Sequence, residues 1–87
     1  MRKPKSNIDI AIGEELKALR SRNKLTLNQV AERMGCSRQL IMFYEKGIVS
    51  ISVPQLIRIC DIYNSSYIVV LEKVKSLVYT ESEDGGL

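Results

Sequence analysis

The stretch TLNQVAERMGCSRQLIMFYEKG predicts two short helices that are separated by only three residues. Thr26 and Gln29 have the spacing of a capping box, in which the threonine hydroxyl accepts the Gln29 amide and the glutamine side chain reaches back. Gly35 is typical of a left-handed helix C-cap, and Ser37 suits the N-cap of a second helix from Arg38 to Lys46. So short a connection forces the two helices to cross steeply and pushes the second one outward, as in a helix-turn-helix motif.

Helical signals also flank this motif. Ile12, Leu16 and Leu19 recur at helical spacing, which predicts a helix from about Ile10 to Asn23. Further along, Ser52 and Gln55 repeat the capping-box spacing, with a proline in the first turn of the helix that follows. The buried face of that helix is expected to consist of Leu56, Ile59, Cys60 and Tyr63.

The segment 67–78 is compatible with two kinds of structure. As a helix it places four apolar residues on one stripe, and as a strand it benefits from the β-branched run Ile68, Val69, Val70. We favour the helix, which makes the fold class all-α: a compact bundle of four to five helices with a central helix-turn-helix. The expected organisation is a basic N-terminal arm at 1–9, one domain at 10–78 and a disordered acidic tail at 79–87.

Composition excludes several classes of function. The 87 residues contain no histidine, no phosphate-binding loop and no cluster of metal ligands, and the serines, cysteines and carboxylates lack a nearby base. We therefore expect neither an enzyme nor a cofactor. Cys36 and Cys60 fit neither a disulfide framework nor a zinc pattern and are expected to be small apolar side chains in a reducing compartment. Because the apolar runs are too short for a membrane span or a signal peptide, we expect a cytoplasmic protein.

Charge is unevenly distributed along the chain. Residues 1–46 hold ten Lys and Arg against five Asp and Glu, a net charge of +5, whereas residues 47–87 hold three against five, a net charge of −2. This asymmetry is typical of a nucleic-acid surface backed by a neutral or acidic scaffold, although a solvated charged surface is the simpler explanation.

The predicted helix 38–46 has more large apolar residues than one buried stripe needs. Ile41, Tyr44 and, less firmly, Leu40 share one face. The other face combines a guanidinium, an amide, a thioether, a phenyl ring and an ammonium group, contributed by Arg38, Gln39, Met42, Phe43 and Lys46.

From Ile12 to about Leu71 the chain resembles the Cro/cI-type (XRE-type) helix-turn-helix regulators, whose fold is that of the lambda-repressor-like DNA-binding domain. The resemblance is carried by LKALRSRNKLTLNQVAERMGCSRQLIMFYEKG and by the fourth-helix stripe. It implies a sequence-specific transcriptional regulator of double-stranded DNA in a bacterial or phage-infected cell. Phage repressors, restriction-modification controllers and antitoxins are all compatible with so short a chain.

The resemblance implies that the third helix lies in the DNA major groove, with Ile41 and Tyr44 turned inward. The expected base-contacting residues are Ser37, Arg38, Gln39, Met42 and Phe43. Arginine can pair with guanine and glutamine with adenine, whereas Phe43, and less firmly Met42, would contact the thymine methyl group. Two alternatives stay open: Arg38 and Gln39 can be an ordinary solvated helix start, and Phe43 can fold back into the core.

The resemblance also implies phosphate contacts and an internal ion pair. The phosphate contacts are expected from Thr26, Leu27, Asn28 and Lys46. Many members have glutamine at the position of Leu27, so its absence puts that one contact in doubt. Arg20 and Glu45 occupy the positions of an ion pair that orients the third helix. In the arm, Arg2, Lys3 and Lys5 are expected either to follow the DNA or to remain a floppy tail.

A homodimer on a two-fold operator is expected, because one recognition helix reads only a few base pairs. The predicted dimer interface is the stripe Tyr67, Leu71, Val74 and Val78, with the alternative that these residues close the domain's own core. The alternative function is a protein-interaction module, an antitoxin or adaptor that uses this fold to hold a partner protein.

Overall fold

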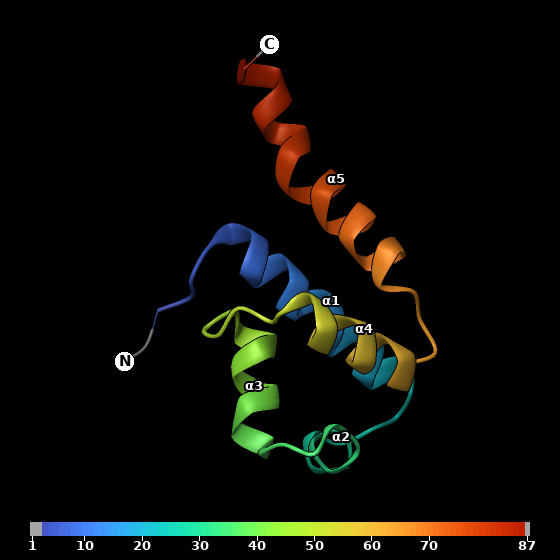
Figure 1. The fold of residues 1–87 in the computed structure, drawn as a ribbon. Coiled ribbons are helices and arrows are strands. Elements are labelled where there is room, and N and C mark those ends of the chain that lie inside the picture. Colours follow the sequence, from blue (N-terminus) through green and yellow to red (C-terminus); the bar gives the residue numbers. More distant parts are fainter. Residues whose placement is uncertain (1–2, 87) are drawn as a thin grey trace.

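The computed structural model describes the backbone of residues 3–86 and the side chains of residues 3–79. Five helices and no strand occur in this range, which confirms the all-α fold class and makes the ambiguous segment 67–78 helical (Figure 1). The helices are α1 (Asn7–Arg22), α2 (Leu27–Met34), α3 (Arg38–Lys46), α4 (Val53–Ile62) and α5 (Tyr67–Gly86).

The turn between α2 and α3 has the predicted chemistry. Thr26 and Gln29 form both bonds of the capping box, at 3.1 Å from the Gln29 amide to the threonine hydroxyl and 2.8 Å from the Thr26 amide to the glutamine side chain. Gly35 has a φ of 70°, a left-handed conformation that glycine adopts without steric cost. The Ser37 hydroxyl accepts the Leu40 amide at 3.1 Å and so begins α3. The motif is therefore specified locally, by its own caps.

The first helix begins earlier than the sequence analysis predicts. Ser6 is its N-cap and accepts the Asp9 amide at 3.1 Å, so α1 starts at Asn7 rather than near Ile10. The Ser6–Asp9 spacing is a cap signal that stands two residues after Pro4 and before any apolar repeat. The predicted arm 1–9 accordingly shortens to the residues before Asn7.

Helices α1 and α3 approach each other closely at Gly13. A Cβ atom at this position would overlap the backbone carbonyl oxygens of Tyr44 and Glu45. Only glycine therefore lets α1 lie against the end of α3, and no periodicity argument identifies it.

The core is one apolar cluster shared by all five helices. Leu16, Val30, Ile41 and Ile59 are fully buried, and the predicted α4 stripe is buried throughout. At the C-terminal end of α1, the Asn23 side chain donates to the Leu19 carbonyl at 2.8 Å and to the Tyr63 carbonyl at 3.1 Å. This amide ties the end of α1 to the end of α4.

Helix α5 closes the core against α1 and α4. Val70 and Val74 are buried, while Tyr67, Leu71 and Val78 pack against the same cluster from its edge. Of the stripe predicted as a dimer interface, Val74 is therefore buried in the domain's own core, whereas Tyr67, Leu71 and Val78 keep part of their surface accessible. Its role in a dimer stays a prediction.

The end of α5 also differs from the expectation. The segment 79–87 was expected to be disordered, whereas its backbone continues the helix through Gly86; Leu87 lies outside the described residues. No helix in the described part of the chain combines the length and the apolar character that a membrane span requires.

Candidate nucleic-acid interface

Helix α3 presents a polar edge at its N-terminus. Ser37, Arg38 and Gln39 are exposed, whereas Ile41 and Tyr44 point into the core as predicted. The Ser37 hydroxyl is held by the cap bond to Leu40, but its own proton is still available to a ligand. The side chains of Arg38 and Gln39, each with paired hydrogen-bonding groups, therefore lie next to each other in the sequence at the N-terminal end of α3.

Met42 and Phe43 are half-buried rather than fully exposed. Met42 lines a hollow between α1, α2 and α3, and Leu27 lines the same hollow. Phe43 makes its own contacts within the chain, and its carbonyl accepts the Ile48 amide at 3.0 Å. These positions leave part of each side chain accessible, so the thymine contact stays a prediction.

The predicted ion pair between Arg20 and Glu45 is present and bidentate. The Arg20 Nε donates to one carboxylate oxygen at 2.6 Å and Nη2 donates to the other at 3.1 Å, while Nη1 donates to the Leu25 carbonyl at 3.0 Å. Both side chains are mostly buried, with exposed fractions of 15% and 7%. The hydrogen bond to Glu45 raises the pKa of the Arg20 guanidinium, against an opposing effect of burial.

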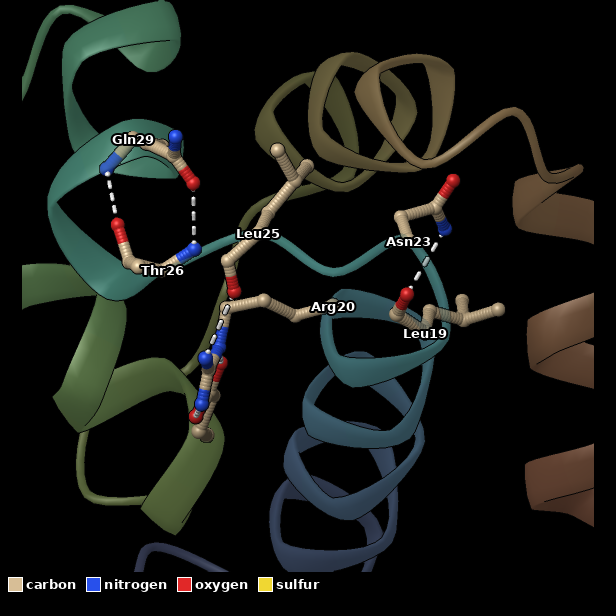
Figure 2. A network of polar contacts seen from close by, with 7 residues as sticks. Leu19, Arg20, Asn23, Leu25, Thr26 and Gln29 are labelled. Atoms are coloured by element: carbon tan, nitrogen blue, oxygen red, sulfur yellow. Dashed lines mark hydrogen bonds and ion pairs between the residues drawn. The ribbon is translucent and has the colours of Figure 1, made fainter.

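This one guanidinium joins three helices. Arg20 belongs to the last turn of α1 and Leu25 immediately precedes the cap of α2 (Figure 2). Glu45 lies in the last turn of α3. Because charge-assisted, two-pronged bonds have a strict geometry, the arrangement defines how α3 sits on the rest of the domain.

Two lysines border the hollow beside the ion pair. The hollow has a volume of about 230 Å³, and its lining includes Lys17, Leu27, Met42 and Lys46 together with the ion pair. Both ammonium groups belong to exposed residues. Lys17 was missed by the sequence analysis, although its position one turn before Arg20 places it on the same face of α1.

The start of α2 adds polar groups next to this hollow. Thr26 and Asn28 are exposed, whereas Leu27 is half-buried and packs against the core. The first-turn amides of Leu27 and Asn28 have no acceptor within the helix, which is the general condition of a helix N-terminus. Leu27 can therefore offer its backbone amide but no polar side chain.

Arg58 of α4 forms a hydrogen bond to the turn between α2 and α3. Its Nη2 donates to the Met34 carbonyl at the end of α2 at 3.2 Å, and its Nη1 donates to the Gln55 side chain at 2.8 Å. The two partners of the first bond are 24 residues apart, so no local pattern in the sequence identifies it.

Burial disfavours the ionised forms of Cys36, Cys60 and Tyr63. Burial raises the pKa of Cys36 and raises that of Cys60 to about 11, so both thiols are protonated at neutral pH. Burial also raises the pKa of Tyr63, whose hydroxyl has no hydrogen-bond partner among the described residues. No group of three or more potential metal ligands occurs in the described part of the chain.

The described part of the N-terminal arm lies next to the end of α3. The Lys5 amide donates to the Gly47 carbonyl at 2.8 Å. The exposed residues Lys3 and Lys5 line a second hollow with Ile48 and Val49, of about 290 Å³. Arg2 lies outside the described residues.

Comparison with known proteins gives one consistent result. Residues 11–67 match the family model described as a helix-turn-helix domain. The antitoxin PezA of Streptococcus pneumoniae serotype 4 is 35% identical over 66 residues, which are 76% of this chain and 42% of PezA. The chain therefore spans less than half the length of that relative.

Solved structures share the fold. The Clp gene regulator ClgR of Corynebacterium glutamicum superposes with a TM-score of 0.73 and 25% identity, over 77% of this chain and 86% of ClgR. The biofilm regulator SinR, solved in complex with DNA, superposes with a TM-score of 0.63 and 21% identity, over 69% of this chain and 97% of SinR.

Proposed function

The chain belongs to the helix-turn-helix domain family and has the fold of Cro/cI-type regulators, and we propose that it is a transcription regulator that reads double-stranded DNA with α3. The observation that carries this proposal is the N-terminal end of α3, where Arg38 and Gln39 are exposed on a helix that the Arg20–Glu45 pair holds in one orientation.

Base reading is assigned to the exposed edge of α3. Arg38 is suited to the O6 and N7 acceptors of guanine and Gln39 to adenine, and each such pair discriminates by ~1–3 kcal/mol. Ser37 can donate its hydroxyl proton to a neighbouring acceptor. Met42 and Phe43 supply the apolar contacts to thymine methyl groups, with the accessible part of each half-buried side chain.

Phosphate binding is assigned to the cationic rim around the ion pair. Lys17 and Lys46, which both line the hollow, contact the DNA backbone, and Thr26, Asn28 and the first-turn amides of α2 supply hydrogen bonds. Lys3 and Lys5 extend this surface past the end of α3. These groups position the protein without reading sequence.

The assembly is proposed to be a homodimer on a two-fold operator, because a single α3 is too short to specify a site by itself. The proposed location is the cytoplasm. The likeness to PezA favours the antitoxins among the possible subclasses of regulator. The second candidate function is a protein-interaction module, such as an antitoxin, whose main role is to hold a partner protein.

A binding titration with a pool of random duplexes tests the proposal. We expect recovery of a two-fold motif and an affinity that falls by orders of magnitude between low and moderate salt, as several neutralised phosphates require. Binding that is weak and independent of salt would favour the protein-interaction module instead.

A further inference from the structure

A second stripe of α5 faces solvent. Ile68, Glu72, Lys75 and Tyr79 follow one another at intervals of four, three and four residues, so their side chains share one side of the helix. All four are exposed, and the two apolar ones leave 51% and 46% of their surface in water. Figure 1 shows the C-terminal half of α5 extending away from the other four helices.

The charges on this stripe have no partner within the described part of the chain. Lys73, on the neighbouring side of α5, pairs with Glu15 of α1 at 3.1 Å. Glu72 and Lys75, by contrast, form no ion pair with any described residue. Lys73 therefore pairs within its own domain, whereas Glu72 and Lys75 point their charges toward solvent.

The order of the four residues is self-complementary when the helix is reversed. In an antiparallel pair centred between positions 73 and 74, residue 68 lies opposite 79 and residue 72 lies opposite 75. Each Ile68 then meets a Tyr79, and each Glu72 meets a Lys75, twice in the pair because of the two-fold axis. A parallel pair in register would instead place Glu72 against Glu72 and Lys75 against Lys75.

We propose that a second copy of this chain docks on this stripe, with the two α5 helices antiparallel and joined by two Glu72–Lys75 ion pairs between flanking Ile68–Tyr79 contacts. This inference rests on the proposed function for its need of a dimer, and it names the interface. It differs from the predicted interface Tyr67, Leu71, Val74 and Val78, of which Val74 is buried and the other three pack at the edge of the core.

The contact is small, and that has a consequence. A pair of helix faces buries less than the roughly 1,600 Å² of a standard stable interface, so the dimer dissociates as the protein is diluted. Occupancy of a two-fold operator then rises with more than the first power of protein concentration, and this dimer equilibrium is a point at which the regulator responds to its own level.

Charge reversal on the full-length protein tests the interface, with sedimentation equilibrium without DNA as the measurement. Glu72→Lys and Lys75→Glu each turn two attractive pairs into two repulsive ones, and each should weaken dimerisation about tenfold or more. The double variant Glu72→Lys/Lys75→Glu should dimerise as the parent does. Glu14→Lys, an exposed reversal on α1, is the matched control and should change nothing.

Mixing the two single variants is the decisive arm. In the mixed dimer every 72–75 contact joins a lysine to a glutamate, so equal amounts should form heterodimers with about the parent's affinity, although each variant alone dimerises more weakly. A monomeric parent, a dimer unaffected by the single reversals, or no rescue in the double variant and the mixture would each overturn the interface. Because no DNA is present, these results are separate from any failure of DNA binding, which the duplex titration reports.

Discussion

The helix-turn-helix region and α5 are held in place by different kinds of interaction. Around α2 and α3, caps, a bidentate ion pair and the Arg58–Met34 bond accompany the apolar packing, so direction as well as contact is specified. Helix α5 contributes two buried valines and one exposed ion pair to α1. Directional polar bonds therefore fix the orientation of α2 and α3, whereas α5 is held mainly by apolar packing on one side.

The largest effect is expected from removing α5. Truncation after Asn64 exposes the surface that Val70 and Val74 cover, and burial of each such side chain contributes about 1.5–3 kcal/mol. The truncated domain should lose most of its stability, measured by urea unfolding with circular dichroism. A truncated chain that unfolds at the same urea concentration as the parent would show that α5 is dispensable for the fold.

Substitution at Gly13 tests the close contact between α1 and α3. Gly13→Ala forces a methyl group into the carbonyls of Tyr44 and Glu45, and overpacking of this kind costs about 1–3 kcal/mol. Ala18→Ser, at an exposed site on the same helix, serves as the control. The two free energies of unfolding should differ clearly; equal values would mean that the helices separate without cost.

Loss of the ion pair should separate orientation from stability. Glu45→Gln removes the negative charge beside the mostly buried guanidinium and should cost about 1–2 kcal/mol of folding free energy. DNA affinity should fall further, by tenfold or more, because α3 loses its defined orientation. Melting curves and duplex titrations of the same samples make the comparison, and a loss of affinity no larger than the loss of stability would argue against the orienting role.

Lysine and arginine variants should differ in kind. Lys17→Ala and Lys46→Ala should each weaken binding to all duplexes and reduce the salt slope by about one unit per lost contact. Arg38→Ala should instead reduce preference at one base pair and leave nonspecific binding nearly intact. Titrations at several salt concentrations on cognate and random duplexes distinguish them, and an unchanged slope for Lys17→Ala would remove that residue from the interface.

The smallest effect concerns the thymine methyl group. Replacement of operator thymines by uracil should weaken the parent modestly, whereas Phe43→Ala should be indifferent at the same position. Identical responses at every position would show that Phe43 does not contact thymine. Unfolding of Phe43→Ala would instead place the ring in the core, consistent with its half-buried position.

Local chemistry accounts for what could be predicted. The capping residues Thr26, Ser37 and Ser52 each accept an amide three residues on, so α2, α3 and α4 begin where their sequences indicate. Apolar spacing likewise identified the buried stripe of α4. The cap at Ser6 has the same form, but it precedes the apolar repeat of α1, which starts only at Ile12, so apolar spacing does not indicate it.

The sequence by itself determined α2, α3 and α4, their caps and the polar edge of α3, since these depend on residues three or four positions apart. Only the tertiary structure decided which stripe of α5 enters the core, which carbonyl accepts from Arg58, and why position 13 requires glycine. The physical reason is that these outcomes depend on the distance between elements far apart in the chain. Periodicity describes each helix face, but only packing decides which face is covered and which remains available to a partner.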